Sequence, residues 1–304
     1  MALLLLGLAA TAHGQPAPPA PADPSAGIKG RRLAALATAT AACHWVGFRY
    51  FDRAWYEGQR TDHIRWIYDW SGETYLNLDK GAHFMAGVAM AEGLGTALVW
   101  SGVEPLPAAL VGTAASWAFL LEIEMRDAYY DQWGFSVPDF TANTVGAALP
   151  LLHQLVPRTR AIRAKFSYHP SSLYLDRQQR RQRNLPHTGH LIDDYEGMTF
   201  WLSVSPTELL PTWCSSWPAW ANLACGYGAH GLHGDNVKSK GPNKRYPELP
   251  DAQPEVFLGL DLNTRPWPPH GRAGRWAHGG LQWLHLPSPA VRVTPSWGVY
   301  LLYM

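Results

Sequence analysis

Two short groups of polar residues in the middle of the chain have the residue types and spacing that acid–base or cation-binding chemistry requires. Asp79 and His83 are four positions apart with Lys80 beside them, and Glu124 and Asp127 are three positions apart. Residues at these spacings lie on the same face of a helix. A histidine beside carboxylates can transfer protons, and the carboxylates can orient its ring or hold a cation.

A third group stands at the start of a further helical segment. Asp139 and Asn143 are four apart, and Ser136 precedes Asp139 by three positions, where its hydroxyl is expected to cap the helix. The candidate catalytic residues are therefore His83, Glu124, Asp127 and Asp139, and the candidate binding residues are Asp79, Lys80, Ser136 and Asn143.

Four apolar runs predict the helices that would position these residues. The runs are rich in Ala, Leu and Val, contain few charges, and cover residues 33–47, 82–100, 106–121 and 144–156. The polar groups stand at the start of the second run, the end of the third and the start of the fourth. If neighbouring helices are antiparallel, all three groups meet at one end of a helical bundle. This convergence is the strongest inference that the sequence supports.

Each polar group also has a structural explanation. An acidic residue at a helix start can complement the helix dipole or form part of a cap, and one in a last turn can simply be solvated. In a further alternative, Lys80 and Arg126 neutralise the carboxylates, and the cluster is a polar clamp that locks the helices together.

The apolar runs favour helices in a membrane. Each run is shorter than the roughly 20 residues of a comfortable span, but its polar flanks extend it to that length. Small residues recur every four positions at Gly87, Ala91 and Gly95, and again at Gly112 and Ser116, as in helices that associate closely in lipid. The predicted fold is mainly α, a short four-helix membrane-type bundle with an irregular, partly β C-terminal appendage. A soluble four-helix bundle with a buried core is the alternative.

Changes in amino-acid composition along the chain predict five segments. They are a signal peptide (1–14), a Pro/Ala-rich linker (15–32), a helical bundle domain (33–156), a basic linker (157–190) and an aromatic-rich C-terminal appendage (191–304). The basic linker includes the run from Arg177 to Arg183. Basic residues beside membrane helices favour contact with anionic lipid headgroups, and a solvated linker is an equally good explanation.

Composition limits the partners and cofactors. Only 16% of the residues are charged and the formal net charge is +1, so no basic surface argues for nucleic acid. Three cysteines exclude a four-thiolate zinc site, and a disulfide between Cys214 and Cys225 is left open. His230 and His233 are weak candidates for metal ligands, so we expect no metal and no cofactor.

The polar groups also resemble a known family. Residues 79–83, 124–127 and 136–143 resemble the D-K-x-x-H, E-x-x-D and S-x-x-D-x-x-x-N motifs of the YfiM-like predicted periplasmic lipoproteins, a bacterial domain family of unknown function. They are more distantly similar to VanZ-like membrane proteins. Later motifs extend the resemblance from about residue 55 to the C-terminus. Two features depart from the family pattern: the N-terminal apolar run lacks a lipobox cysteine, and Glu122 adds an acid beside the family's glutamate.

The resemblance implies a location in the bacterial cell envelope and supplies no activity. The sequence predicts a membrane protein of the envelope with a structural or interaction role and with membrane lipid as its partner. The alternative is a membrane-interface enzyme or a lipid-headgroup-binding protein that uses His83 and the neighbouring carboxylates. A conduit for ions or protons is less favoured, because the polar groups gather at one end of the helices. The sequence does not indicate whether the protein lies in the inner or the outer membrane, and it identifies no protein partner.

One structural observation would separate the two main hypotheses. A cleft that exposes His83 within reach of Glu124 and Asp139 would favour a binding protein or enzyme. A buried cluster that Lys80 and Arg126 neutralise fully would favour the polar clamp.

Overall fold

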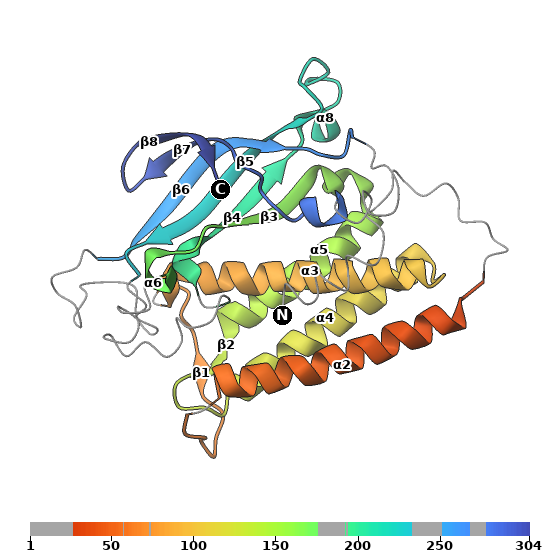
Figure 1. The fold of residues 1–304 in the computed structure, drawn as a ribbon, viewed down its shortest axis with the longest axis vertical. Helices are drawn as coiled ribbons and strands as arrows, with labels where there is room; N and C mark the ends of the chain where they lie inside the picture. Colours follow the sequence, from red (N-terminus) through yellow and green to blue (C-terminus); the bar gives the residue numbers. More distant parts are fainter. Residues whose placement is uncertain are drawn as a thin grey trace.

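The computed structural model describes residues 27–56, 58–72, 74–175, 192, 194–232, 251–267 and 278–304. In these residues a layer of long helices packs against an antiparallel sheet (Figure 1). The predicted signal peptide, most of the Pro/Ala-rich linker, the run from Arg177 to Arg183, and His233 lie outside the described residues.

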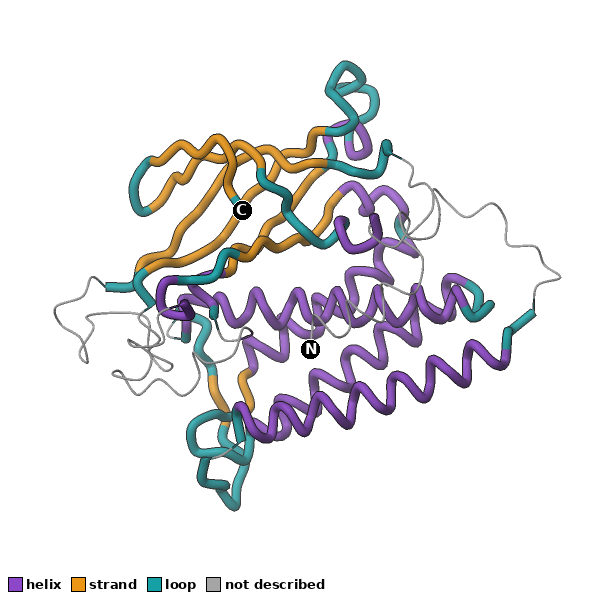
Figure 2. Tube along the Cα trace, viewed as in Figure 1, coloured by secondary structure: helices purple, strands orange, loops and turns teal. Residues whose placement is uncertain are grey.

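Long helices form the first layer (Figure 2). They are α2 (Gly30–Ala54), α3 (Leu78–Trp100), α4 (Pro105–Asp127) and α5 (Val137–Leu155). Only four residues connect α3 to α4, so these helices run in opposite directions, and α5 starts near the end at which α4 stops. α3, α4 and α5 pack on one another, and α2 lies along the outside of this group.

Short elements gather at the end of the layer where α3 begins. The strands β1 (Trp66–Ile67) and β2 (Phe135–Ser136) pair in parallel, and the 3-10 turn η1 (Tyr75–Asn77) leads directly into α3. β2 in turn leads directly into α5. The pairing of β1 with β2 therefore ties the segment before α3 to the start of α5.

Six antiparallel strands form the second layer. They are β3 (Ile162–Tyr168), β4 (Met198–Val204), β5 (Ala221–His230), β6 (Gln253–Leu262), β7 (Ser288–Thr294) and β8 (Gly298–Tyr303), and they follow one another in the sheet in sequence order. Short helical turns lie beside the strands: η2 (Pro157–Ala161), α6 (Ser172–Leu175), η5 (Tyr195–Gly197) and α8 (Pro206–Leu209).

This sheet shows that the predicted fold class is wrong. The described chain has a mixed α/β fold, not a four-helix bundle with an irregular appendage. The strands do not show a simple polar–apolar alternation. Ser203, Asn222 and Asp261 are buried on the same face as Trp201 and Phe257, whereas Leu202 and Leu258 are exposed on the other face. In most half-buried sheets the apolar residues mark the covered face.

α3 lies between the sheet and the other helices. Met85 and Val88 of α3 pack against Ala164 of β3, and Phe166 and Phe200 complete this contact from the sheet. α4 and α5 cover α3 from other sides. The helix that carries Asp79, Lys80 and His83 is therefore fixed by both layers.

The close approach of α3 to its neighbours depends on small residues. A Cβ on Gly87 would lie 2.7 Å from the Ala147 nitrogen, and a Cβ on Gly146 would overlap the carbonyl oxygen of Phe84. The Ser116 hydroxyl of α4 donates a hydrogen bond to the Gly87 carbonyl oxygen at 3.0 Å. The small-residue spacing in the sequence therefore marks the contacts between these helices.

Two stretches are long and apolar enough to cross a membrane by length and composition, namely Tyr75–Trp100 and Pro105–Asp127. The same properties suit the central helix of a water-soluble protein, and α3 is covered by both layers. A location of the helices in a membrane therefore stays a prediction.

We expect Gly146→Ala to destabilise the protein by about 1–3 kcal/mol, because the added methyl group forces α3 and α5 apart. Gly30→Ala is the matched control, since no atom lies within 4 Å of a Cβ at that position. It should leave stability within about 1 kcal/mol of wild type. Chemical denaturation followed by circular dichroism measures both effects, and equal stabilities for the two variants would refute the proposed contact.

Candidate functional site

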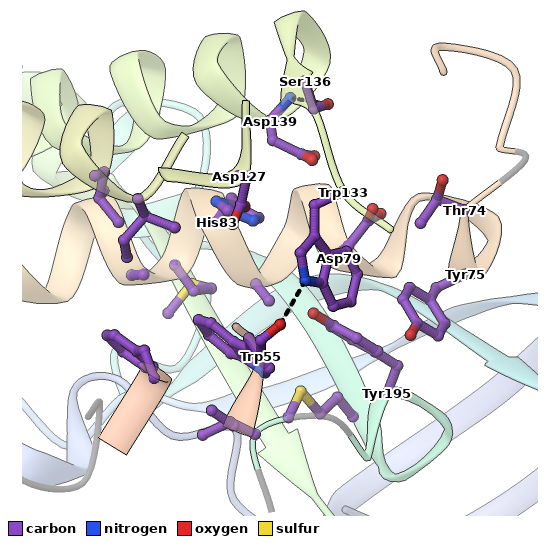
Figure 3. A pocket seen from close by; sticks show the side chains of 18 of the residues that line it. Trp55, Thr74, Tyr75, Asp79, His83, Asp127, Trp133, Ser136, Asp139 and Tyr195 are labelled. Atoms are coloured by element: carbon purple, nitrogen blue, oxygen red, sulfur yellow. Dashed lines mark hydrogen bonds between the residues drawn. The ribbon is translucent and has the colours of Figure 1, made fainter. Parts of the chain in front are cut away.

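The three polar groups meet at one end of the helical layer. α3 begins there with Asp79 in its first turn, α4 ends there with Glu124 in its last turns, and α5 begins there with Asp139. Figure 3 shows Asp79, His83, Asp127 and Asp139 around one cavity. All eight candidate residues of the sequence analysis belong to this cluster or to its direct supports, because antiparallel helices place these particular ends together.

Lys80 is the central cation of the cluster. Its ammonium group forms ion pairs with Asp69, with Asp79 Oδ2 at 2.8 Å and with Asp139 Oδ1 at 3.4 Å. The Asp69 carboxylate also accepts a hydrogen bond from the Ser136 hydroxyl at 3.1 Å. One side chain thereby joins the segment before α3, the first turn of α3 and the first turn of α5.

Ser136 organises the start of α5. Its hydroxyl oxygen accepts a hydrogen bond from the Asp139 N–H at 3.2 Å, which is the expected helix cap. Its own N–H donates to Glu124 Oε2 at 3.2 Å. The cap therefore fixes the direction of the Asp139 side chain and anchors a carboxylate of α4 at the same time.

His83 lies against a buried pair from the two neighbouring helices. Its Nδ1 is 3.0 Å from the Asn143 Oδ1 and 3.5 Å from the Glu124 Oε1. Asn143 Nδ2 donates a hydrogen bond to the same glutamate oxygen at 3.0 Å. Glu124 is 1% exposed and Asn143 is fully buried, so both are held rigidly behind the imidazole.

A cavity of about 320 Å³ opens beside the cluster. Its polar end is formed by Asp69, Thr74, Asp79, His83, Asp127, Ser136 and Asp139. Its other walls are mainly aromatic and aliphatic, and they include Phe51, Trp55, Met85, Met90, Leu120, Ile123, Trp133, Phe166 and Phe200. The indole N–H of Trp133 donates to the Trp55 carbonyl oxygen at 2.9 Å and joins two of these walls (Figure 3). The cavity therefore has one polar end and an apolar body.

Burial shifts several carboxyl groups of the cluster toward the protonated form. Burial, reinforced by the nearby charges of Asp139 and Asp127, raises the pKa of Glu124 well above its ordinary value. Burial also raises the pKa of Asp127 to about 7, although Tyr56 and His83 oppose the shift. Burial and the charge of Asp139 raise the pKa of Asp79 to about 7. The polar end of the cavity therefore has more carboxyl groups than the nearby cations can stabilise in their ionised form.

The ion pairs of Lys80, in contrast, stabilise the charged forms of Lys80 and Asp69. Burial lowers the pKa of Lys80, but the carboxylates of Asp139 and Asp79 outweigh it and raise this pKa above its ordinary value. Burial likewise disfavours the charged form of Asp69, but hydrogen bonds from Lys80 and other donors lower its pKa overall. Lys80 and Asp69 therefore favour each other's charged form.

Arg126 does not neutralise the cluster. Its guanidinium group pairs with Glu122 at 2.9 Å and with Asp52 of α2 at 3.3 Å, and it lies over the ring of Phe48. The clamp that the sequence suggested for Lys80 and Arg126 together is therefore formed by Lys80 alone. Arg126 and Glu122 instead connect α4 to α2.

Sequence reasoning missed part of the site. Asp69, Thr74 and Tyr75 stand in the irregular segment before α3, where no periodic pattern assigns a direction to a side chain. Trp55 and Trp133 come from segments that are close only in the folded chain. The frequent use of tryptophan, with 15 copies in the chain, is the one signal that could have indicated an aromatic wall.

Other residues noted in the sequence do not join the site. Cys43, Cys214 and Cys225 are free, so the optional disulfide is not formed, and Cys43 is only partly buried. His230 on β5 lies 3.9 Å from Glu255 and does not line the cavity.

Comparison with known proteins adds one match. Residues 68–155 match the family model described as "Predicted periplasmic lipoprotein (DUF2279)", and this range spans η1, α3, α4, β2 and α5. The match agrees with the YfiM-like resemblance over this segment and with a cell-envelope protein, while the similarity to VanZ-like proteins is not shown. No curated protein and no solved structure matches the chain.

We expect Asp127→Asn to change how stability depends on pH. The pKa of Asp127 rises from 3.8 to about 7 on folding, so between these values the folded chain keeps a proton that the unfolded chain has released. This carboxyl group therefore costs stability as pH rises from about 4 to about 7. The free energy of unfolding of the asparagine variant should increase relative to wild type over that interval and then level off.

The control is Asp131→Asn, which removes a carboxylate that is 64% exposed. Urea denaturation at closely spaced pH values compares the three proteins. The control should follow the wild-type profile, and an Asp127→Asn profile parallel to wild type would show that this carboxyl group is not perturbed.

Proposed function

We propose that this is a cell-envelope protein that binds an amphiphilic molecule, with the apolar part of the ligand in the cavity and its polar group against His83, Asp127 and Asp139. The observation that carries the proposal is that the polar cluster forms one end of a cavity whose other walls are apolar. A cluster that only locked helices together would not need to open into such a cavity.

The cluster divides into supporting and facing residues, and this division supports the proposal. Lys80, Glu124 and Asn143 are not among the residues that line the cavity, and their polar atoms bond to residues that do. His83 and Asp139 face the cavity and are positioned by these supports. The structural role suggested by the sequence is thus performed by one part of the cluster, and the other part is left for a ligand.

The charges at the polar end favour a ligand that brings positive charge. The carboxylates are those of Asp69, Asp79, Glu124, Asp127 and Asp139. Lys80 and the imidazole of His83 are the bases that contact them. Opposite charge within about 4–6 Å stabilises an ionised carboxylate. The polar group of the ligand is therefore an amine, or it binds together with a cation.

The size and walls of the cavity suit an organic molecule. About 320 Å³ lies at the lower end of the range for small-molecule sites. The rings of Phe51 and Trp55, which both line the cavity, stack on each other with their centroids 4.4 Å apart. Aromatic faces bury apolar groups well and also attract ammonium groups.

The exposed surface supports membrane lipid as the source of the ligand. Leu106, Leu110 and Val111 of α4 are exposed, as are Leu202 and Leu258 on the outer face of the sheet. Apolar side chains on both layers, together with polar side chains turned inward, are typical of a protein that contacts lipid. A protein that associates with membrane lipid in this way can take an amphiphile directly from the bilayer.

We expect Ala86→Trp to weaken binding of the neutral fluorescent amphiphile N-phenyl-1-naphthylamine at least about tenfold, because Ala86 lines the cavity and an indole would fill it. Val99→Trp on the same helix is the matched control, since Val99 is exposed and lies outside the cavity. Fluorescence titration in EDTA measures both variants. Equal affinity in wild type and Ala86→Trp would overturn the proposal.

Head-group preference is tested by competition between molecules with the same twelve-carbon chain. Dodecylamine should displace the fluorescent probe at lower concentration than laurate does, since the polar end is acidic. All concentrations stay below the point of micelle formation. Tighter binding of laurate in EDTA would contradict the charge assignment while leaving the cavity itself intact.

A further inference from the structure

We propose that His83, Glu124 and Asp139 bind one divalent transition-metal ion, such as Zn²⁺, at the polar end of the cavity. The three side chains come from α3, α4 and α5, and one ligand atom from each lies within 4.8 Å of the other two. The inference deepens the proposed function, because the ion would supply positive charge where the polar group of the ligand lies. It departs from the expectation of no metal that composition and cysteine count suggested.

The carboxylate of Asp139 has an oxygen with unused bonding capacity. The residue is 9% exposed, and its Oδ1 is buried and forms no hydrogen bond in the structure. The nearest cation is Lys80 at 3.4 Å, and Lys80 is closer to both Asp69 and Asp79. Figure 3 shows the Asp139 side chain directed from α5 toward the cavity. This buried carboxylate oxygen has one long ion pair and no hydrogen bond, and a second cation would complete its coordination.

The other two ligands are already held in place. Glu124 accepts hydrogen bonds from the Ser136 N–H and from the Asn143 side chain, which fix both of its oxygens. His83 Nδ1 is 3.5 Å from Glu124 Oε1, a separation that one ion can bridge with ordinary bond lengths near 2.1 Å. Metal binding through Nδ1 would replace the present contact of this atom with Asn143 Oδ1 at 3.0 Å. Hydrogen bonds that orient metal ligands in this way are a general feature of metal sites.

The donor set selects the class of ion. One imidazole and two carboxylates suit Zn²⁺ and similar first-row ions, whereas Mg²⁺ and Ca²⁺ prefer oxygen ligands alone. The imidazole binds as the neutral ring and the carboxylates bind as anions, so any protons on these groups are released to the solvent. Two carboxylates and one divalent ion together carry no net charge, and the ion would stabilise the ionised forms of Glu124 and Asp139 in their buried positions.

The test measures Zn²⁺ binding to the full-length protein by isothermal titration calorimetry after treatment with EDTA and in the absence of amphiphile. Wild type should bind one ion per chain, and His83→Ala and Asp139→Asn should each weaken binding about 100-fold or more. The matched control is His44→Ala. His44 Nε2 contacts Glu122 at 2.8 Å between α2 and α4, and this pair is not part of the three-ligand group. The control should bind Zn²⁺ as wild type does.

A second measurement on wild type alone does not depend on whether the variants fold. Co²⁺ bound by nitrogen and oxygen ligands in place of Zn²⁺ should give visible absorption bands that disappear when one equivalent of Zn²⁺ is added. Absence of a one-to-one Zn²⁺ complex in wild type, or unchanged binding in a folded His83→Ala variant, would overturn the proposal. Since no amphiphile is present, these results are independent of the fluorescent-probe titration: the cavity can bind probe without the metal, and the metal can bind without the probe.

Discussion

The shared ion pairs of Lys80 are the interaction on which the rest of the site depends. The ammonium group contacts Asp69, Asp79 and Asp139, which belong to three different segments of the chain. A buried ion pair adds little net stability compared with apolar packing, but removing one partner leaves uncompensated charge and is costly. Lys80 therefore fixes which ends of the helices meet, and its carboxylates cannot be accommodated in the interior without it.

The packing of the helices and the position of the cavity follow from this constraint. Gly146 and Gly87 let α5 approach α3 closely, and the Ser136 cap then directs Asp139 to Lys80. The sheet holds α3 from the other side through Met85 and its neighbours. These contacts leave His83 at the boundary between the polar cluster and the apolar cavity, which is where the proposed ligand and metal ion would meet.

The sequence predicted the cluster better than the fold. Spacing of three or four residues assigns side chains such as Asp79 and His83 to one helix face, and short connections make neighbouring helices antiparallel, so convergence could be expected without coordinates. Asp69 could not be found, because it lies in an irregular segment whose direction depends on Lys80. The appendage was predicted to be partly β, but its continuous sheet was not, because long-range strand pairing forms it and its polar residues, such as Asp261 in its ion pair with Lys165, face inward.

The most direct test of the central claim is the free energy of unfolding of Lys80→Met at pH 8 and at pH 5, compared with Lys29→Met at an exposed position. At pH 8 the Lys80 variant should lose about 3–5 kcal/mol, because it leaves buried carboxylates without their cation. At pH 5 the loss should be smaller, since the pKa of Asp79 lies near 7 and its carboxyl group is then protonated. A loss below about 1 kcal/mol at pH 8, or an equal loss at both pH values, would contradict the account.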